Sequence, residues 1–128
     1  MSNITKVIAR QVFDSRGNPT IEAEVFCKEI SSKAICPSGA STGTYEAHEK
    51  RDIKNKKYLG KSVFSPVKII NLKISKKLIN KNVHNQELID SILINLDGTK
   101  NKVNIGANAI LAVSMAVKKL SSKIKKIP

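Results

Sequence analysis

Apolar and polar residues alternate along the first third of the chain, a pattern typical of half-buried strands. Residues 4–13 are rich in β-branched and aromatic side chains, and residues 14–19 then form a dense cluster of turn-forming residues. Residues 20–27 alternate strictly, and a turn over residues 28–32 leads to a short third strand over residues 33–36. The pattern therefore predicts a three-stranded antiparallel meander, which needs a covering layer to be stable.

The period changes to about 3.6 residues in the second half of the chain, where the pattern predicts helices. Ser65 is expected to cap the first helix, with Pro66 at its first helical position. The second helix is expected to begin after the capping residue Asn85 and to end at Gly98, which suits a left-handed C-cap. The predicted buried stripes consist of Val67, Ile70, Ile74 and Leu78 in the first helix and Leu88, Ile92 and Leu96 in the second.

A third helix is predicted over residues 106–120, where small side chains allow close approach of helix axes. Residues 115–128 combine an apolar stripe with five lysines. Such segments bind membranes or acidic partners in some proteins, but we interpret this one as an ordinary final helix whose cations suit the negative end of the helix dipole. Residues 44–52 are expected to add a helical turn and residues 53–64 an irregular connection. The predicted fold class is α+β, with the three-stranded meander packed on a helical layer.

Length and composition fit one globular domain over residues 1–128. The chain is 41% hydrophobic and 26% charged, a balance that disordered chains do not reach. It is too short for a (β/α)₈ barrel. No apolar stretch approaches the ~18 residues that cross a bilayer, and the N-terminus carries charges where a signal peptide needs an apolar run. We therefore expect a cytoplasmic protein without a membrane span.

The net charge of +13 arises entirely after residue 52, because residues 1–52 hold seven basic and seven acidic side chains. This asymmetry is compatible with a small basic nucleic-acid-binding module, the alternative hypothesis for function. Such modules generally use arginine for bidentate contacts and aromatic side chains for stacking, whereas this chain has 20 lysines, three arginines and five aromatic residues. We therefore favour solvated lysine-rich faces, and binding with a steep salt dependence would indicate the alternative.

The two cysteines and two histidines do not predict a metal site. Cys27 and Cys36 lie near the ends of a predicted hairpin, where a cross-strand disulfide is sterically conceivable. A cytoplasmic chain keeps both thiols reduced, so we expect buried apolar side chains. His48 and His84 do not fall at zinc-ligand spacing from either cysteine.

Residues 37–43 form the most informative loop, with two glycines and three hydroxyl groups directly after a predicted strand. Glycine on both sides of Ala-Ser-Thr lowers the steric cost of a hinge, and the hydroxyl oxygens suit Mg²⁺ or a phosphate. From these residues alone a plain Gly/Ser-rich turn is the favoured interpretation and a ligand loop the alternative, and the P-loop pattern is absent. No carboxylate pair or Ser-His-Asp arrangement is evident, so these residues alone predict no complete active site.

Several runs of residues resemble the enolase family in order and in spacing. They are Asp-Ser-Arg-Gly-Asn-Pro-Thr at 14–20, Pro-Ser-Gly-Ala-Ser-Thr-Gly at 37–43, Glu-Ala at 46–47, Leu-Gly-Lys at 59–61, Leu-Asp-Gly-Thr at 96–99, Asn-Lys at 101–102 and Gly-Ala-Asn-Ala-Ile-Leu-Ala-Val-Ser at 106–114. The resemblance covers essentially the whole chain, but only the N-terminal part of the family's sequence.

The resemblance implies that residues 1–128 form the enolase N-terminal capping domain. It implies reversible dehydration of 2-phosphoglycerate to phosphoenolpyruvate in glycolysis, in which two Mg²⁺ ions stabilise an ene-diolate while a lysine removes a proton. It assigns ligation of the second Mg²⁺ to Ser41, with Gly39, Ala40 and Thr42 in the same mobile lid over the substrate. The acid and the base belong to a barrel domain absent from this chain, so we expect no catalytic residue in it and no activity of the chain alone.

The resemblance also implies partners. Arg10 and Glu22 match positions that form ion pairs across the family's dimer interface, with partners in the other subunit's barrel domain, so a homodimer is expected of the full-length protein. Bacterial enolases join RNA-degradation assemblies, which adds a further expected partner. By analogy with the family, a cell-surface or secreted pool is expected besides the cytoplasmic one.

Four residues depart from the family pattern, namely His48, Lys50, Ile53 and Ser62. None of them is Ser41, so they do not change the assignment of the lid. They leave open the path of residues 44–62.

Overall fold

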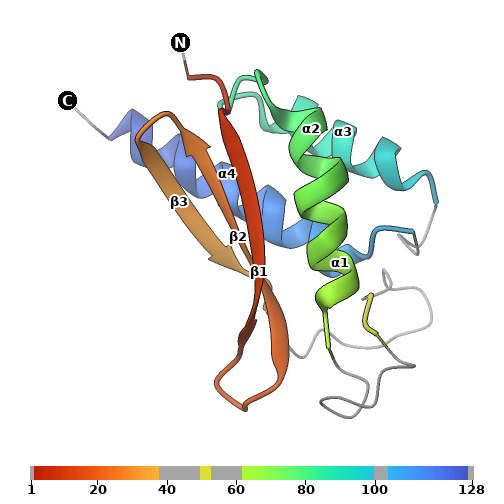
Figure 1. Cartoon of the computed structure of the whole chain (residues 1–128). Coiled ribbons are helices and arrows are strands. Elements are labelled where there is room, and N and C mark those ends of the chain that lie inside the picture. Colours follow the sequence, from red (N-terminus) through yellow and green to blue (C-terminus); the bar gives the residue numbers. More distant parts are fainter. Residues whose placement is uncertain (1, 38–49, 53–61, 100–103, 127–128) are drawn as a thin grey trace.

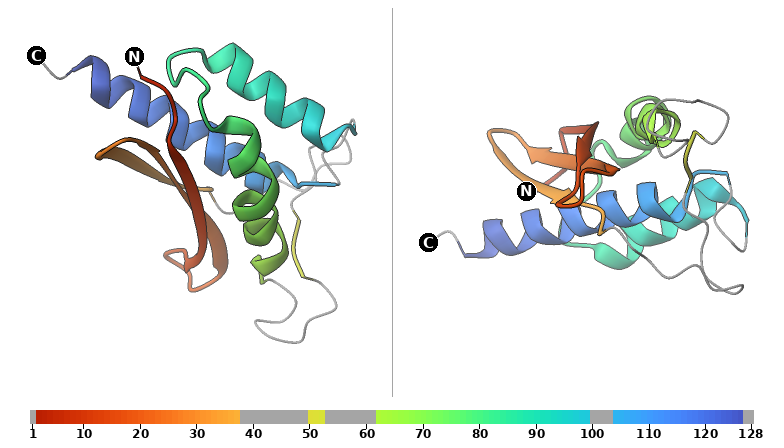
Figure 2. Two further views of the ribbon diagram at one scale, coloured as in Figure 1. Left: turned by 45° about the horizontal axis from the view of Figure 1, so that its top comes forward. Right: turned by 90° about the horizontal axis from the view of Figure 1, so that it is seen from below.

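The computed structural model describes residues 2–37, 50–52, 62–99 and 104–126. In chain order its elements are β1 (Lys6–Phe13), β2 (Pro19–Cys27), β3 (Ile30–Ile35), α1 (Phe64–Ile69), η2 (Ile70–Ile74), α2 (Ser75–Leu78), α3 (Gln86–Asp97) and α4 (Ala107–Lys125). The segments α1, η2 and α2 follow one another directly as one helix with a π-helical middle, and this helix lies beside β1 (Figure 1). Helix α4 crosses one face of the sheet (Figure 2). The predicted α+β class is confirmed.

The sheet is the predicted antiparallel meander, with strand order β1-β2-β3. Its alternation places one set of small and β-branched side chains on the face toward the helices, where they are buried, with β2 and β3 against α4 and β1 against α1, η2 and α2. These side chains are Val7, Ala9, Ile21, Ala23, Val25 and Ala34. The strict alternation predicted for the second strand therefore does separate a buried face from a more exposed one.

The ends of the strands differ from the prediction. Strand β3 begins at Ile30, not at residue 33, because Lys28 adopts a positive φ of 58° and a two-residue turn already brings Ile30 opposite Cys27. Strand β1 begins at Lys6, not at residue 4. Ile4 is fully buried and bonds instead to the chain after α2, donating its N–H to the Lys81 carbonyl at 2.9 Å.

The first helix begins at Phe64, so the predicted Ser65 cap is wrong. The N-cap position is taken by Val63, which has no capping side chain, and Pro66 lies in the first turn but not at its first position. The Ser65 N–H donates instead to the carboxylate of Asp52, at 3.2 Å. A residue distant in sequence thus satisfies the helix terminus that a local cap was expected to satisfy. The predicted buried residues Ile70, Ile74 and Leu78 are confirmed.

Helix α3 has both predicted caps, but it buries a different stripe. The Asn85 side chain accepts the Leu88 N–H at 3.2 Å, and Gly98 ends the helix with a φ of 73°. Leu88 itself is 41% exposed, and Ile92 and Leu96 are half-buried. The buried residues are Ile89, Leu93 and Asp97. The helix is rotated by about one residue from the expected orientation, which turns the Asp97 carboxylate toward hydrogen-bond donors just before α4.

Helix α4 is longer than predicted, because residues 106–120 and the final amphipathic segment form one continuous helix to Lys125. Its small residues Ala109, Ala112 and Ala116 are fully buried, as expected of a helix that packs closely on a sheet. Neither α4 nor any other helix in the described ranges is long and apolar enough to cross a membrane.

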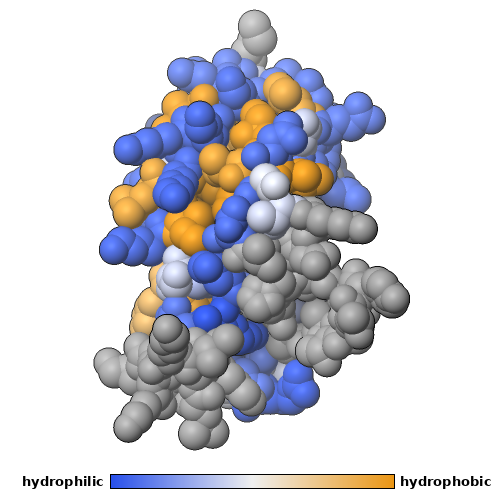
Figure 3. Space-filling view, turned by 90° about the vertical axis from the view of Figure 1, so that its right-hand side faces the viewer, coloured by the Kyte–Doolittle hydropathy of each residue, from blue (hydrophilic) through white to orange (hydrophobic). Residues whose placement is uncertain are grey.

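The face formed by α1, α2 and α3 presents apolar side chains among polar ones (Figure 3). The large apolar residues exposed on these helices and on η2 are Phe64, Leu72, Leu88 and Ile94. Scattered exposed apolar residues are normal on a protein surface. The main core lies on the other side of the helices, against the sheet and α4.

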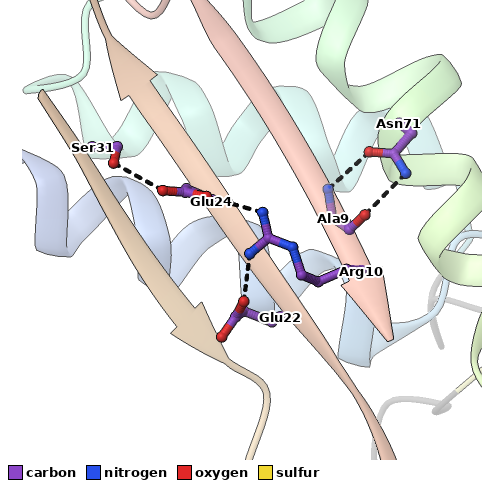
Figure 4. Close-up of polar contacts among 6 residues, drawn as sticks. All are labelled: Ala9, Arg10, Glu22, Glu24, Ser31 and Asn71. Atoms are coloured by element: carbon purple, nitrogen blue, oxygen red, sulfur yellow. Dashed lines mark hydrogen bonds and ion pairs between the residues drawn. The ribbon is translucent and has the colours of Figure 1, made fainter. Parts of the chain in front are cut away.

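Asn71 closes the outer edge of β1. Its side-chain oxygen accepts the Ala9 N–H at 2.8 Å, and its side-chain nitrogen donates to the Ala9 carbonyl at 3.1 Å (Figure 4). Asn71 lies in η2, so the helix supplies at this point the hydrogen bonds that a fourth strand would supply. An open strand edge invites pairing with another chain, and Asn71 removes this opportunity at the centre of β1.

Replacing Asn71 by alanine should lower the free energy of unfolding by about 1 kcal/mol, because two hydrogen bonds to the strand are lost. Urea unfolding followed by circular dichroism measures this change. Asn95→Ala is the matched control, since Asn95 is exposed on α3 and bonds only to Ser91, at 3.4 Å. Equal stability of the two variants would show that the Asn71 contact contributes nothing.

Candidate functional site

The two ends of segment 38–49 are attached to neighbouring residues of β2. On one side, the Cys36 N–H donates to the Ile21 carbonyl at 2.8 Å, and the Thr20 hydroxyl donates to the Cys36 carbonyl at 3.0 Å. On the other side, Arg51 Nη1 donates to the Pro19 carbonyl at 2.8 Å. Because Pro19 and Thr20 are adjacent, the chain leaves and returns at the start of β2. We call Thr20, Cys36, Lys50, Arg51 and Asn108 the segment base.

Asn108 attaches the segment base to helix α4. Its side-chain oxygen accepts the Lys50 N–H, and its side-chain nitrogen donates to the Lys50 carbonyl, both at 2.9 Å. Asn108 is only 3% exposed, so these bonds form largely away from water. A buried amide with both polar atoms bonded to one backbone residue restrains that residue in position and in orientation.

Gly106 allows this attachment to form. It occupies the N-cap position of α4 with a φ of 97°, a region that only glycine adopts readily. A β-carbon at this position would lie 2.5 Å from the Lys50 β-carbon and 2.6 Å from Asn108 Oδ1. The Gly-Ala-Asn run therefore allows α4 to pack closely against Lys50.

Asp97 fixes the chain that leads into α4. Its carboxylate is 2% exposed and accepts the N–H of Ile105 at 2.7 Å and both the N–H and the hydroxyl of Thr99. Burial acts most strongly on the pKa of Asp97 and raises it. The opposing hydrogen bonds, from the Thr99 hydroxyl and from the N–H groups of Ile105, Thr99 and Gly106, together prevail, and the pKa lies below its ordinary value. Asp97 is therefore held as an anion.

The structure brings together runs of residues that are far apart in the sequence. Residues 19–20, 36, 97 and 106–108 all contribute to the segment base or to its support. The sequence indicated the loop at 37–43, but it did not indicate Asn108, Asp97 or Gly106 as the residues that support it. The Gly-x-Asn spacing at the start of a helix was the only available signal.

Several predicted residues lie outside the described part of the chain. They include the lid residues Gly39, Ala40, Ser41 and Thr42, together with His48 and Ile53. The predicted helical turn over residues 44–52 also falls mostly there, and its described part, residues 50–52, is not helical. Lys50 and Ser62 are described. Asn108 contacts only the backbone atoms of Lys50 through hydrogen bonds, so the unusual side chain at this position does not disturb them.

Arg10 and Glu22, the two predicted interface residues, lie on the sheet face opposite α4 and form an ion pair with each other (Figure 4). Arg10 also contacts Glu24 at 3.0 Å, and Glu24 accepts a hydrogen bond from Ser31 at 2.9 Å. The hydrogen bonds to Glu24 and then to Glu22 raise the pKa of Arg10, and the bond from Arg10 lowers the pKa of Glu24. Two carboxylates share one guanidinium, and Lys33, which pairs with Glu24 across β2 and β3, adds a second cation beside them.

The cysteines agree with the prediction of buried, reduced side chains, because Cys27 and Cys36 are both free and buried. Burial raises the pKa of the Cys27 thiol. His84 contacts the Ser121 hydroxyl through Nδ1 at 2.6 Å. In the described ranges, no three His, Cys, Asp or Glu side chains come together as a metal site. The described residues thus do not form a Mg²⁺ site by themselves, and its carboxylate ligands would have to come from elsewhere.

A groove of about 650 Å³ lies along the outer side of α4. It is lined by Met115, Lys118, Lys119, Ser122, Lys123 and Lys126. The lining offers neither the guanidinium forks nor the aromatic faces that nucleic-acid modules use. It agrees with the interpretation of the lysines as a solvated helix face.

Comparison with known proteins extends over the whole chain. A family model described as the N-terminal domain of enolase matches residues 4–128. A protein named enolase from Pelagibacter ubique is 73% identical over 128 residues, which is 100% of this chain. Enolases from Methanococcus vannielii and Methanococcus maripaludis are 56% and 54% identical over 127 residues, or 98% of this chain. These alignments cover 31%, 30% and 30% of the relatives, so the chain spans less than a third of their length.

Proposed function

The chain belongs to the enolase family, in which it matches the N-terminal domain, and we propose that it caps a Mg²⁺-dependent lyase that reversibly dehydrates 2-phosphoglycerate to phosphoenolpyruvate in glycolysis. The segment base is the observation that carries this proposal. It holds the residues that flank 38–49 on either side, with Cys36 and Arg51 bonded to adjacent residues of β2 and Lys50 bonded to a buried asparagine of α4. A segment with fixed ends can change conformation without disturbing the fold, as a lid requires.

We assign residues 39–42 to the lid and the Ser41 hydroxyl to the second Mg²⁺ as one oxygen ligand. When bound, Mg²⁺ stabilises negative charge that develops on the substrate. The role proposed for this chain is to cover the substrate, exclude water and place the Ser41 oxygen. The general acid, the general base and the carboxylate ligands are assigned to a barrel domain outside residues 1–128.

A chimaera tests this function. Residues 1–128 replace the matching residues of the Pelagibacter ubique enolase, and formation of phosphoenolpyruvate is followed by its ultraviolet absorbance. We expect turnover by the chimaera and none by the 128-residue chain alone. A chimaera that folds but is inactive, while the parent Pelagibacter ubique enolase is active in the same assay, would contradict the proposed function. Robust turnover by the isolated chain would contradict the assignment of the catalytic groups to another domain.

In the same chimaera, Ser41→Ala should lower kcat by about 10- to 100-fold, because one ligand that acts only in the closed site is lost. Ser38→Ala is the matched control, since it removes a hydroxyl from the same segment without removing the proposed ligand. A kcat of Ser41→Ala equal to that of Ser38→Ala would refute the role of Ser41.

We further propose that the full-length protein is a homodimer and that the sheet face with Arg10 and Glu22 lies at the interface. The exposure of the cluster supports the proposal, because the Arg10 side chain is 38% exposed on the sheet face opposite α4, where charged groups of a partner can reach it. Ile35, which pairs with Glu22 across β2 and β3, is 45% exposed on this face, where a partner would cover it. A cytoplasmic location, in agreement with two free cysteines, and participation in an RNA-degradation assembly complete the proposal.

A further inference from the structure

We propose that Asn108 is a positioning residue of this enzyme, which sets the place at which the chain returns from the lid by holding the backbone of Lys50. The proposal rests on the function proposed above and adds a residue to it. Asn108 is placed in this role because its hydrogen bonds, both at 2.9 Å, go to the N–H and the carbonyl of one residue that lies 58 positions away.

The direction of these bonds separates positioning from helix capping. An asparagine near a helix N-terminus usually accepts N–H groups of its own helix. Asn108 lies in the first turn of α4, yet both of its side-chain polar atoms bond to Lys50. The two bonds flank the α-carbon of Lys50, as the bonds of a neighbouring strand would, and so they fix both adjacent peptide planes.

The support of Asn108 is rigid. It is followed in α4 by Ala109, Ala112 and Val113, which are fully buried in the core. Three residues before Asn108, the N–H of Ile105 donates to the Asp97 carboxylate at 2.7 Å. A functional segment is positioned most accurately by side chains on well-packed elements. These contacts hold the backbone of Lys50 at a defined place relative to α4.

Hydrogen exchange measured on the 128-residue chain tests the contact directly. We expect Asn108→Ala to increase the exchange rate of the Lys50 amide at least ~10-fold, because the amide loses its acceptor. Asn108→Asp keeps an acceptor but loses the donor to the Lys50 carbonyl, and it should give a smaller increase. Lys50→Ala keeps the backbone contact and the β-carbon, so the amide at position 50 should stay protected. Unchanged exchange in Asn108→Ala, with the amides of β2 still protected, would overturn the proposal.

Kinetics of the chimaera test the consequence for the enzyme. At a temperature where the variant is fully folded, Asn108→Ala should lower kcat about 10-fold and raise the Mg²⁺ concentration for half-maximal rate, because the lid is less often placed correctly. A merely structural role would lower the unfolding temperature and leave the Mg²⁺ dependence unchanged, which would overturn the proposal. Asn95→Ala on the exposed side of α3 is the control.

The two measurements keep the proposals distinguishable. An inactive chimaera without any substitution would contradict the proposed function, while hydrogen exchange would still report on the contact of Asn108 with Lys50. An active chimaera in which Asn108→Ala matches Asn95→Ala in kcat and Mg²⁺ dependence would overturn the positioning role alone.

Discussion

Gly106→Ala is expected to lower the free energy of unfolding by about 3 kcal/mol, more than the same change at the other glycines that the structure describes, Gly17 and Gly98. Two costs combine. A φ of 97° is strained for alanine, and the added β-carbon would lie 2.5 Å from the Lys50 β-carbon and 2.6 Å from Asn108 Oδ1. Relief of this overlap would separate α4 from Lys50 and break both bonds of Asn108. Urea unfolding of the purified chain measures the change.

Gly17→Ala is the matched control for Gly106→Ala. Gly17 also has a positive φ, 79°, but a β-carbon there would meet no atom within 4 Å. This variant should therefore show only the conformational cost, roughly 1 kcal/mol. Equal destabilisation of the two variants would show that close packing of Gly106 against Lys50 contributes nothing to stability.

Asp97→Asn should be the second most destabilising change, lowering the free energy of unfolding by about 2–3 kcal/mol at neutral pH. The substitution keeps the shape of the side chain. It replaces an acceptor oxygen by a donor, so a buried N–H, of Ile105 or of Thr99, loses its partner. Glu87→Gln is the control, because it neutralises an exposed carboxylate on the same helix.

The effect of Asp97→Asn should also depend on pH. The pKa of Asp97 is lower in the folded chain than its ordinary value, so the folded state binds this proton less readily than the unfolded state. The stabilisation is therefore complete above about pH 4–5 and is lost as the pH falls through the lower, folded pKa. Urea unfolding from pH 7 down to pH 3 should show the difference between the two proteins shrinking. A difference that stays constant over this range would contradict an anionic role for Asp97.

The sheet and the helix ends with local caps could be predicted from the sequence. Strict alternation over residues 20–27 specified which face of β2 is buried, because a strand has a period of two. Asn85 and Gly98 marked the ends of α3 because their own side chain or backbone conformation satisfies the helix terminus. These signals are contained within a few consecutive residues.

The features predicted wrongly depend on partners distant in sequence. The N–H of Ser65 bonds to Asp52, so the helix did not need Ser65 as its cap. The buried stripe of α3 contains Ile89 in place of Leu88, and it includes Asp97, whose carboxylate accepts the N–H of Ile105 just before α4. Periodicity alone treats an aspartate as a polar, outward residue, and so it could not predict this rotation.

The candidate site was predictable only in part. The composition of residues 37–43 was compatible with a hinged loop that offers oxygen ligands but favoured a plain turn, and only the resemblance to enolase selected Ser41 within it. The residues that hold the two ends of the segment gave no separate signal, because a buried asparagine and a glycine near a helix start have many uses. Their roles followed from their contacts with Lys50.

The sequence by itself determined the antiparallel meander, the helical stretches that follow it in the described residues, and the family, since these depend on local periodicity and on runs of consecutive residues. Only the tertiary structure decided that Pro19, Thr20, Cys36, Arg51 and Asn108 meet at one place. The physical reason is that hydrogen bonds over 16, 32 and 58 positions form between backbone groups and side chains whose proximity is set by packing of α4 on the sheet.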